Sequence, residues 1–111
     1  DLLAMNLLIR FNKTMTYLHG ASTHHKKEFM APYALQWASI QRAKHIGMDA
    51  YDFFGISPDD ARDHPLAAVT RFKMGFGGAP VHFPGTFEFP LRPLSYTIYK
   101  NMKRIKTILH S

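Results

Sequence analysis

Lys73 and its neighbour Phe72 are the residues whose types and spacing suggest acyl-transfer chemistry. A lysine ammonium beside an aromatic ring can stabilise negative charge that develops only in a transition state. In acyl transfer from an ester, that charge is the oxyanion of a tetrahedral intermediate, and one well-placed donor stabilises it by about 3–4 kcal/mol. The competing interpretation is a surface lysine near a helix C-terminus, favoured there by about 0.3–1 kcal/mol. By residue type alone the surface lysine is the simpler interpretation.

A glycine-rich segment, residues 75–79, follows this pair directly. It lacks the Gly-Lys-Ser/Thr ending of a nucleotide-binding P-loop, and it follows a predicted helix instead of opening one. We therefore expect these glycines to let the chain turn sharply and to bring its backbone close to a substrate.

Other catalytic chemistries find little support in the sequence. His19, His24 and His25 have no acidic residue at metallohydrolase spacing and no His-Glu-x-x-His motif, so we predict a polar loop and no metal site. Ser22 and Ser39 lie outside any Gly-x-Ser-x-Gly elbow and have no recognisable base. Because the chain has no cysteine, thiol nucleophiles, thiolate metal sites and disulfides are excluded.

Composition predicts a folded, basic domain. The 111 residues are 46% hydrophobic and 20% charged, which favours a packed core built around the many aromatic side chains. The net charge of +6 is compatible with nucleic acid, nucleotide phosphates or an anionic membrane, and equally with a basic surface that has no specific partner. The opening residues lack an initiator Met and the pattern of a signal peptide, so we expect a cut from a longer protein.

The first half of the chain predicts the order strand, strand, helix, strand. Residues 2–11 are expected to form a buried strand and 14–19 its hairpin partner, with a turn at 12–13 and small residues 20–23 leaving the sheet. A helix is expected from Pro32 to a stop at Gly47, with Tyr33, Trp37 and Ile40 at helical spacing and alanines allowing close packing. Residues 48–56 follow as a strand.

The second half predicts two helices and a broken strand. Residues 57–60 and 63–65 both carry helix-start signals, and the second leads into a helix over 66–74 that ends at the glycines. Residues 81–83 and 86–89 are expected to form a last strand region. A final helix over 93–109 has an apolar stripe too strong to be left in solvent and a basic opposite face. The expected class is α/β or α+β with a mixed sheet.

Five segments, in order and at fitting spacing, resemble the FemABX family of peptidoglycan bridge-forming aminoacyltransferases, and the match covers nearly the whole chain. They are Tyr17-Leu18-His19-Gly20-Ala21-Ser22, Ala31-Pro32-Tyr33-Ala34-Leu35-Gln36-Trp37, Ala43-Lys44-His45-Ile46-Gly47, Tyr51-Asp52-Phe53-Phe54-Gly55-Ile56 and Arg71-Phe72-Lys73 with Gly75-Phe76-Gly77-Gly78. Two residues depart from the family pattern: His19 replaces a tyrosine and Phe54 replaces a glycine.

The resemblance implies a GNAT-like acyltransferase fold, with residues 1–111 forming one portion of a domain in a longer protein. It implies transfer of an amino acid from aminoacyl-tRNA to the peptide side chain of a UDP-linked or lipid-linked muropeptide, with no cofactor. It also implies a cytoplasmic protein that works at the inner face of the plasma membrane, where the lipid-linked precursor lies. The final helix is then expected to dock on an N-terminal domain outside this sequence.

The resemblance also assigns site residues. Lys73, with Phe72, would stabilise the oxyanion, and Tyr17, Arg71 and Ser22 would contact substrate or tRNA. The positive charge is then consistent with a tRNA or diphosphate partner.

Two alternatives stay open at this point. A GNAT-like N-acyltransferase could use acyl-CoA, although the Gln/Arg-x-x-Gly-x-Gly/Ala loop that holds its pyrophosphate is absent. A non-catalytic module could bind RNA through the basic helix face at residues 100–106, although that face is more simply a solvated outer surface.

Overall fold

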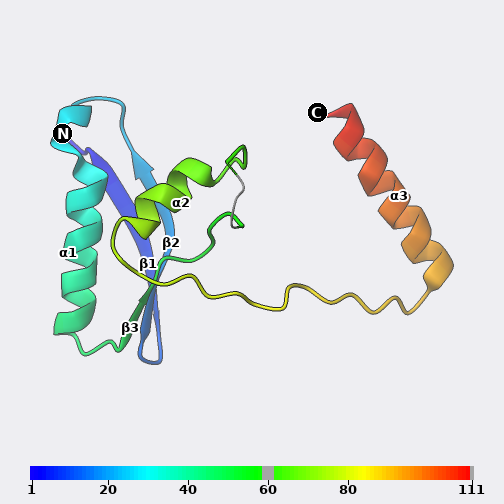
Figure 1. Ribbon diagram of the computed structural model, residues 1–111, viewed down its shortest axis with the longest axis horizontal. Coiled ribbons are helices and arrows are strands. Elements are labelled where there is room, and N and C mark those ends of the chain that lie inside the picture. The colour runs from blue at the N-terminus through cyan, green and yellow to red at the C-terminus, as the bar shows by residue number, and fades with distance from the viewer. Residues whose placement is uncertain (59–61, 111) are drawn as a thin grey trace. The chain divides into compact units, whose positions relative to one another are not determined.

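A computed structural model of the protein describes residues 1–58 and 62–110. The chain divides into two compact units, Asp1–Ala79 and Pro80–Ser111 (Figure 1). The first unit holds a sheet and two α-helices, and the second holds one long helix. The described elements are β1 (Ala4–Phe11), β2 (Thr14–Ser22), a 3-10 turn (Lys27–Phe29), α1 (Ala31–His45), β3 (Ala50–Asp52), α2 (Ala67–Met74) and α3 (Pro93–Leu109).

The sheet is mixed and has the order β1-β2-β3. β1 and β2 form the predicted antiparallel hairpin, with its turn at Asn12-Lys13 and a register shift between Leu7 and Leu8. β3 joins β2 in parallel, Met15 opposite Tyr51. The prediction that residues 20–23 leave the sheet is wrong for residues 20–22, because these pair with residues 4–6 of β1. The β-β-α-β order and the α+β class are confirmed at this level.

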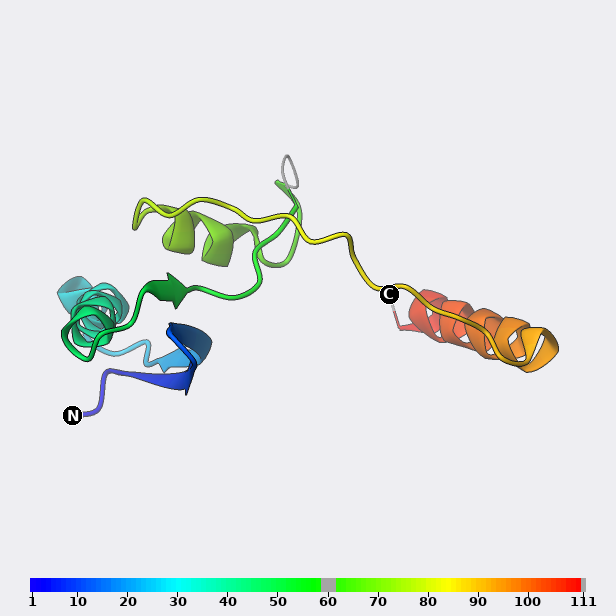
Figure 2. The same cartoon turned by 90° about the horizontal axis from the view of Figure 1, so that it is seen from below.

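α1 covers one face of the sheet, as the end-on view in Figure 2 shows. α1 begins at Ala31, one residue before the predicted start at Pro32, and Gly47 follows its end with a φ of 82°, as the predicted stop requires. The expected close packing through alanines holds at Ala43, which is buried, whereas Trp37 remains 56% exposed. The helix instead buries the polar Gln36, because side chains of the sheet satisfy its amide (see below).

β1 is half-buried, whereas a buried strand was predicted. Alternate residues lie toward α1, whereas Met5, Leu7, Ile9 and Phe11 are exposed. Successive strand side chains point to opposite faces of a sheet, so a single covering helix can bury only every second residue. The aromatic-rich core predicted from composition is accordingly small: within the described residues only Met15 and Ala43 are buried apolar side chains.

The predicted strand over residues 48–56 ends at Asp52. Phe54 ends it by adopting a φ of 64°, and its N–H donates to Asp52 Oδ1 at 2.8 Å. The first helix-start signal was predicted at residues 57–60, and its residues 59 and 60 lie outside the described residues. The N–H of Ser57 donates a hydrogen bond to Thr70 Oγ1 at 2.8 Å. The second signal precedes α2, which ends at Gly75 as predicted.

The second unit contains no strand among its described residues, so the predicted strand region over 81–89 is wrong. Prolines at positions 80, 84 and 90 remove backbone donors along this segment, and strands persist only where a neighbouring strand pairs with them. α3 forms as predicted from Pro93, and none of its side chains is buried. No described helix is long and apolar enough to cross a membrane.

Candidate functional site

Lys73 lies on α2 and is almost fully buried, with 8% of its surface exposed. Its Nζ donates a hydrogen bond to the carbonyl oxygen of Gly55 at 2.6 Å and lies 5.7 Å from the centroid of the Tyr17 ring. A solvated lysine at a helix end would be neither buried nor hydrogen-bonded to the backbone of a distant loop. The interpretation of Lys73 as a surface residue is therefore wrong.

The electrostatic state of Lys73 follows from this burial. Removal from water lowers the pKa of its ammonium, and the nearby Asp52 carboxylate partly opposes that shift. An ammonium has three N–H donors, and the Gly55 carbonyl occupies one of them. Among the described residues, Lys73 is thus held in place by a backbone acceptor of the loop after β3.

The loop after β3 supplies the other half of this arrangement. The Phe54 N–H donates a hydrogen bond to Asp52 Oδ1 at 2.8 Å. Phe54 itself adopts a left-handed backbone conformation that a bulky residue rarely takes. The next residue is Gly55, whose carbonyl accepts from Lys73. The same short turn therefore carries both the hydrogen-bond acceptor of Lys73 and the Asp52 carboxylate that acts on its charge, while the Phe54 ring stays exposed.

Tyr17 reaches Lys73 from β2, and burial raises the pKa of its hydroxyl. The ring lies across Gly20: a Cβ atom at position 20 would overlap the Tyr17 hydroxyl and lie 2.9 Å from its Cζ. This close approach explains why position 20 is a glycine, because any side chain there would displace the Tyr17 ring.

Phe72 belongs to an aromatic cluster that joins α2 to α1 and to the loop after β3. Its ring meets Tyr33 edge-to-face at 4.7 Å and Phe76 at 5.4 Å. Phe76 in turn lies 5.4 Å from Phe53, which lies 5.2 Å from Tyr51. Such pairs contribute about 0.5–1.5 kcal/mol each beyond their buried area. The cluster fixes α2, and with it Lys73, against the rest of the unit.

A buried polar chain supports the same region and was missed from the sequence. Gln36, only 1% exposed, accepts from Asn6 Nδ2 at 2.8 Å and donates to the Tyr51 hydroxyl at 2.9 Å. Burial raises the pKa of Tyr51. A glutamine inside the Ala-Pro-Tyr-Ala-Leu-Gln-Trp segment was the available signal, since buried amides need partners on neighbouring elements.

The structure does not bring the remaining predicted residues to Lys73. Ser22 is exposed at the end of β2, and Arg71 is exposed on α2. Within residues 1–58 and 62–110, no hydrogen bond or ion pair joins either side chain to Lys73. No group of three or more His, Cys, Asp or Glu side chains in that part of the chain is placed to hold a metal ion.

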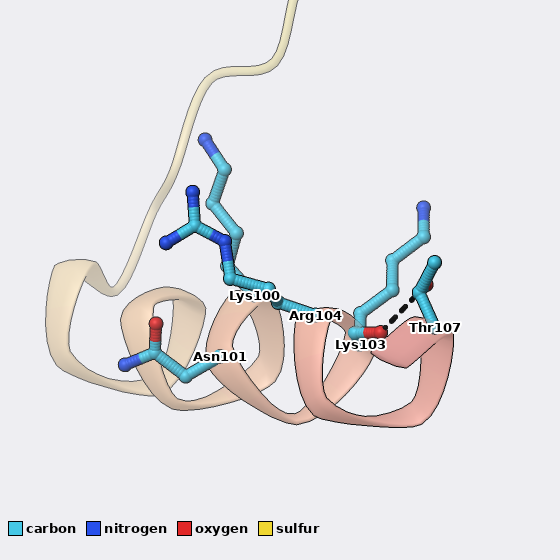
Figure 3. A pocket seen from close by; sticks show the side chains of 5 residues that line it. All are labelled: Lys100, Asn101, Lys103, Arg104 and Thr107. Atoms are coloured by element: carbon cyan, nitrogen blue, oxygen red, sulfur yellow. Dashed lines mark hydrogen bonds between the residues drawn. The ribbon is translucent and has the colours of Figure 1, made fainter. Parts of the chain in front are cut away.

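Two open surface hollows among the described residues are lined by residues other than Lys73. One lies on α1 and is lined by Trp37, Ile40, Gln41, Lys44 and His45. The other lies on α3 between Lys100, Lys103 and Arg104, with Asn101 and Thr107 at its borders (Figure 3).

Comparison with known proteins places this arrangement in a family. Aminoacyltransferase FemA of Staphylococcus epidermidis is 33% identical over 92 residues, and FemA of Staphylococcus aureus is 30% identical over 92 residues. Each alignment covers 83% of this chain and 22% of the relative, so the chain spans about a fifth of the length of these proteins. No solved structure matches the chain. Residues 2–104 match the FemAB family, and the chain therefore belongs to that family.

Proposed function

We propose that the protein to which this chain belongs transfers an aminoacyl group from aminoacyl-tRNA to the peptide side chain of a peptidoglycan precursor. The acceptor would be a UDP-linked or lipid-linked muropeptide, and the product would be part of an interpeptide bridge of the cell wall. Family membership supports the aminoacyltransferase activity. The buried, hydrogen-bonded Lys73 is the observation that carries the assignment of a site.

In this proposal Lys73 acts on the tetrahedral intermediate. The acceptor amine attacks the carbonyl carbon of the aminoacyl ester, its C–N bond forms, and the carbonyl oxygen becomes an oxyanion. Lys73 donates a hydrogen bond to that oxygen, and its low-dielectric surroundings strengthen the interaction. When the intermediate collapses, the C–O bond to the tRNA ribose breaks. The ribose oxygen gains a proton as the attacking amine loses one.

The neighbouring residues divide into positioning and contact roles. Phe72, whose ring packs against Tyr33, positions α2 so that Lys73 reaches the Gly55 carbonyl. Tyr17 lies against Lys73 and would limit one side of the substrate position. Arg71 and Ser22, both exposed, would contact the tRNA or the precursor farther from the reacting atoms.

The proposal includes the wider setting of the reaction. The sheet and helices of the first unit would be a portion of a GNAT-like domain, and the rest of the longer protein would hold the precursor. Because this chain spans 22% of its FemA relatives, the activity is proposed for the longer protein. The reaction would take place in the cytoplasm, at the inner face of the plasma membrane when the precursor is lipid-linked, and it would need no cofactor.

The test is a transfer assay with the longer protein, charged tRNA and a muropeptide acceptor. We expect Lys73→Ala to lower kcat by about 10²–10³-fold, the usual loss when one oxyanion donor is removed. Lys13→Ala is the matched control, because that exposed lysine lies in the turn between β1 and β2 and should leave the rate unchanged.

Circular dichroism of both variants separates a lost donor from a lost fold. If folded Lys73→Ala protein transfers at the wild-type rate, the assignment of Lys73 is wrong. If the wild-type protein transfers nothing to any muropeptide, the proposed reaction is wrong.

A further inference from the structure

Thr70 lies one helical turn before Lys73 on α2, and residues three apart in a helix share a face. Its Oγ1 accepts a hydrogen bond from the N–H of Ser57 at 2.8 Å. The hydroxyl groups of the two residues form a second hydrogen bond, with Ser57 Oγ 2.9 Å from Thr70 Oγ1. Ser57 is only 7% exposed. Two hydrogen bonds shielded from water thus tie the loop after β3 to α2.

The face of α2 that carries Thr70 and Lys73 holds one short segment of this loop, residues 55–57. Lys73 donates to the carbonyl oxygen of Gly55 at 2.6 Å, and Thr70 binds the residue two positions later in the chain. Gly55 is conformationally free, and no described atom lies within 4 Å of the place where its Cβ would be. The direction of its carbonyl therefore depends on how the residues on either side are held.

The segment is held on both sides of Gly55. On the N-terminal side, the N–H of Phe54 donates to Asp52 Oδ1 at 2.8 Å. On the C-terminal side, Ser57 is bound to Thr70, and Ile56 is the one residue between Gly55 and that contact. A glycine between two fixed neighbours has few orientations left for its carbonyl.

We propose that Thr70 is a positioning residue of the acyl-transfer site. By holding Ser57 it keeps the Gly55 carbonyl where Lys73 meets it, and so fixes the direction of the Lys73 ammonium toward the developing oxyanion. The proposal rests on the role proposed above for Lys73 in transfer. Thr70 itself touches no reacting atom, but a displacement of roughly 1 Å at a catalytic group can lower a rate by about 10²-fold.

The alternative is that the contact between Ser57 and Thr70 only stabilises the fold, as buried polar groups with partners do. The placement of the bonds favours positioning. Thr70 and Lys73 are one turn apart on α2, and their partners are two residues apart in the loop. Loss of the Thr70 bond would therefore reach the acceptor of Lys73 directly, whereas a contact that only stabilises the fold would act independently of Lys73.

The kinetic experiment uses the longer protein in the transfer assay. Thr70→Val keeps the shape of the side chain and removes the acceptor of the Ser57 N–H. We expect kcat to fall by about tenfold or more with KM changed by about twofold at most, because the loss acts on the transition state. Thr70→Ser keeps the hydroxyl and should restore kcat to within about threefold of wild type.

A second comparison removes the group that Thr70 is proposed to position. In protein that already carries Lys73→Ala, Thr70→Val should lower kcat by less than about twofold, because residues that act as a unit are not additive. Circular dichroism must show each variant folded. No loss of kcat in Thr70→Val, or an equal loss with and without Lys73, would overturn the proposal.

Urea denaturation of the 111-residue chain tests the contact without transfer activity. Thr70→Val and Lys73→Met should be coupled: together they should raise the unfolding constant about fivefold less than the product of their single effects. Thr23→Val is the matched control, because the Thr23 hydroxyl bonds to the carbonyl oxygen of His25 in its own loop and should act additively with Lys73→Met. Additive effects at Thr70 would overturn the proposal.

The outcomes remain separable when one variant fails. If Thr70→Val unfolds the chain, Thr70→Ala removes the same acceptor with a smaller side chain and takes its place in both experiments. If Lys73→Ala transfers at the wild-type rate, the catalytic role of Lys73 is wrong. The urea measurements then still decide whether Thr70 holds the acceptor of Lys73 in place.

Discussion

Two lysines of this chain lie over tyrosine rings at similar distances, Lys73 at 5.7 Å from the Tyr17 centroid and Lys100 at 5.4 Å from that of Tyr96. Lys100 and Tyr96 are one turn apart on exposed α3. Lys73 and Tyr17 come from different elements, and Lys73 is also buried and bonded to Gly55. A cation over a ring is therefore not enough to mark a site. What distinguishes Lys73 is burial together with a backbone acceptor already in place.

The largest structural effect should come from Gly20→Ala. The new Cβ would overlap the Tyr17 hydroxyl, so we expect a loss of about 1–3 kcal/mol in the free energy of unfolding, measured by urea denaturation. Adding Tyr17→Phe should restore part of that loss by removing the closest overlap. Gly78→Ala is the control, since a Cβ there meets nothing within 4 Å. Equal effects at positions 20 and 78 would show that Tyr17 does not need this space.

Replacing each tyrosine by leucine compares the two pairs directly. Tyr17→Leu should lower the free energy of unfolding by about 1–2 kcal/mol, because the ring is partly buried against Lys73. Tyr96→Leu should lower Tm less, because α3 buries no side chain and the change removes only an exposed hydrogen bond from the Tyr96 hydroxyl to Glu88 and the contact with Lys100. If Tyr96→Leu lowered Tm more than Tyr17→Leu does, the Lys100 pair would be the more stabilising of the two. Thermal unfolding followed by circular dichroism suffices for both.

Lys73, unlike Lys100, is hydrogen-bonded to the loop after β3, and a change at Phe54 tests that loop. Glycine adopts a φ of 64° without steric cost, so Phe54→Gly should stabilise the fold by about 1 kcal/mol relative to Phe54→Ala. Both variants remove the ring, and only the alanine keeps the strain. Equal stability of the two variants would mean that the loop relaxes, and that the left-handed turn does not hold Gly55 in place.

The smallest expected effect is a change in the pH dependence of stability. Burial lowers the pKa of Lys73 in the folded chain below the value of 10.5 that it has in the unfolded chain. Between the folded and the unfolded pKa the unfolded chain binds more protons, so the free energy of unfolding rises with pH. Asp52→Asn keeps an acceptor for Phe54 but removes the charge that raises this pKa. In Asp52→Asn the rise in the free energy of unfolding should therefore begin at a lower pH and be larger than in the wild-type chain.

Urea denaturation over an alkaline pH series measures that rise, with Lys73→Met as the control in which it disappears. An identical rise in Lys73→Met would assign it to other groups. Half-buried Tyr17 and Tyr51 act in the opposite sense, because their raised pKa values make stability fall as pH climbs above 10.0.

Local signals in the sequence predicted local structure well. The turn at residues 12–13, the helix with Pro32 in its first turn and the helix from Pro93 all appear where propensity and capping put them. Features that depend on distant partners were not predictable in this way. Gln36 is buried because Asn6 and Tyr51 meet it, and residues 81–89 form no strand among the described residues.

For the candidate site too, local features were predictable and contacts with distant residues were not. Lys73 was identified from its type, its neighbour and the segment around it, but its partners were not. Gly55 lies 18 residues earlier in the chain, and it reaches Lys73 through a left-handed phenylalanine that no propensity predicts. Ser22 and Arg71 were assigned from the resemblance, and their exposed positions leave their roles to be tested.

The exposed side of β1 has a consequence for handling the protein. Met5, Leu7, Ile9 and Phe11 face outward, and β1 forms an edge of the sheet within the described residues. An apolar strand with free backbone donors is a template on which another strand can assemble. The purified 111-residue chain should therefore become more turbid as its concentration rises.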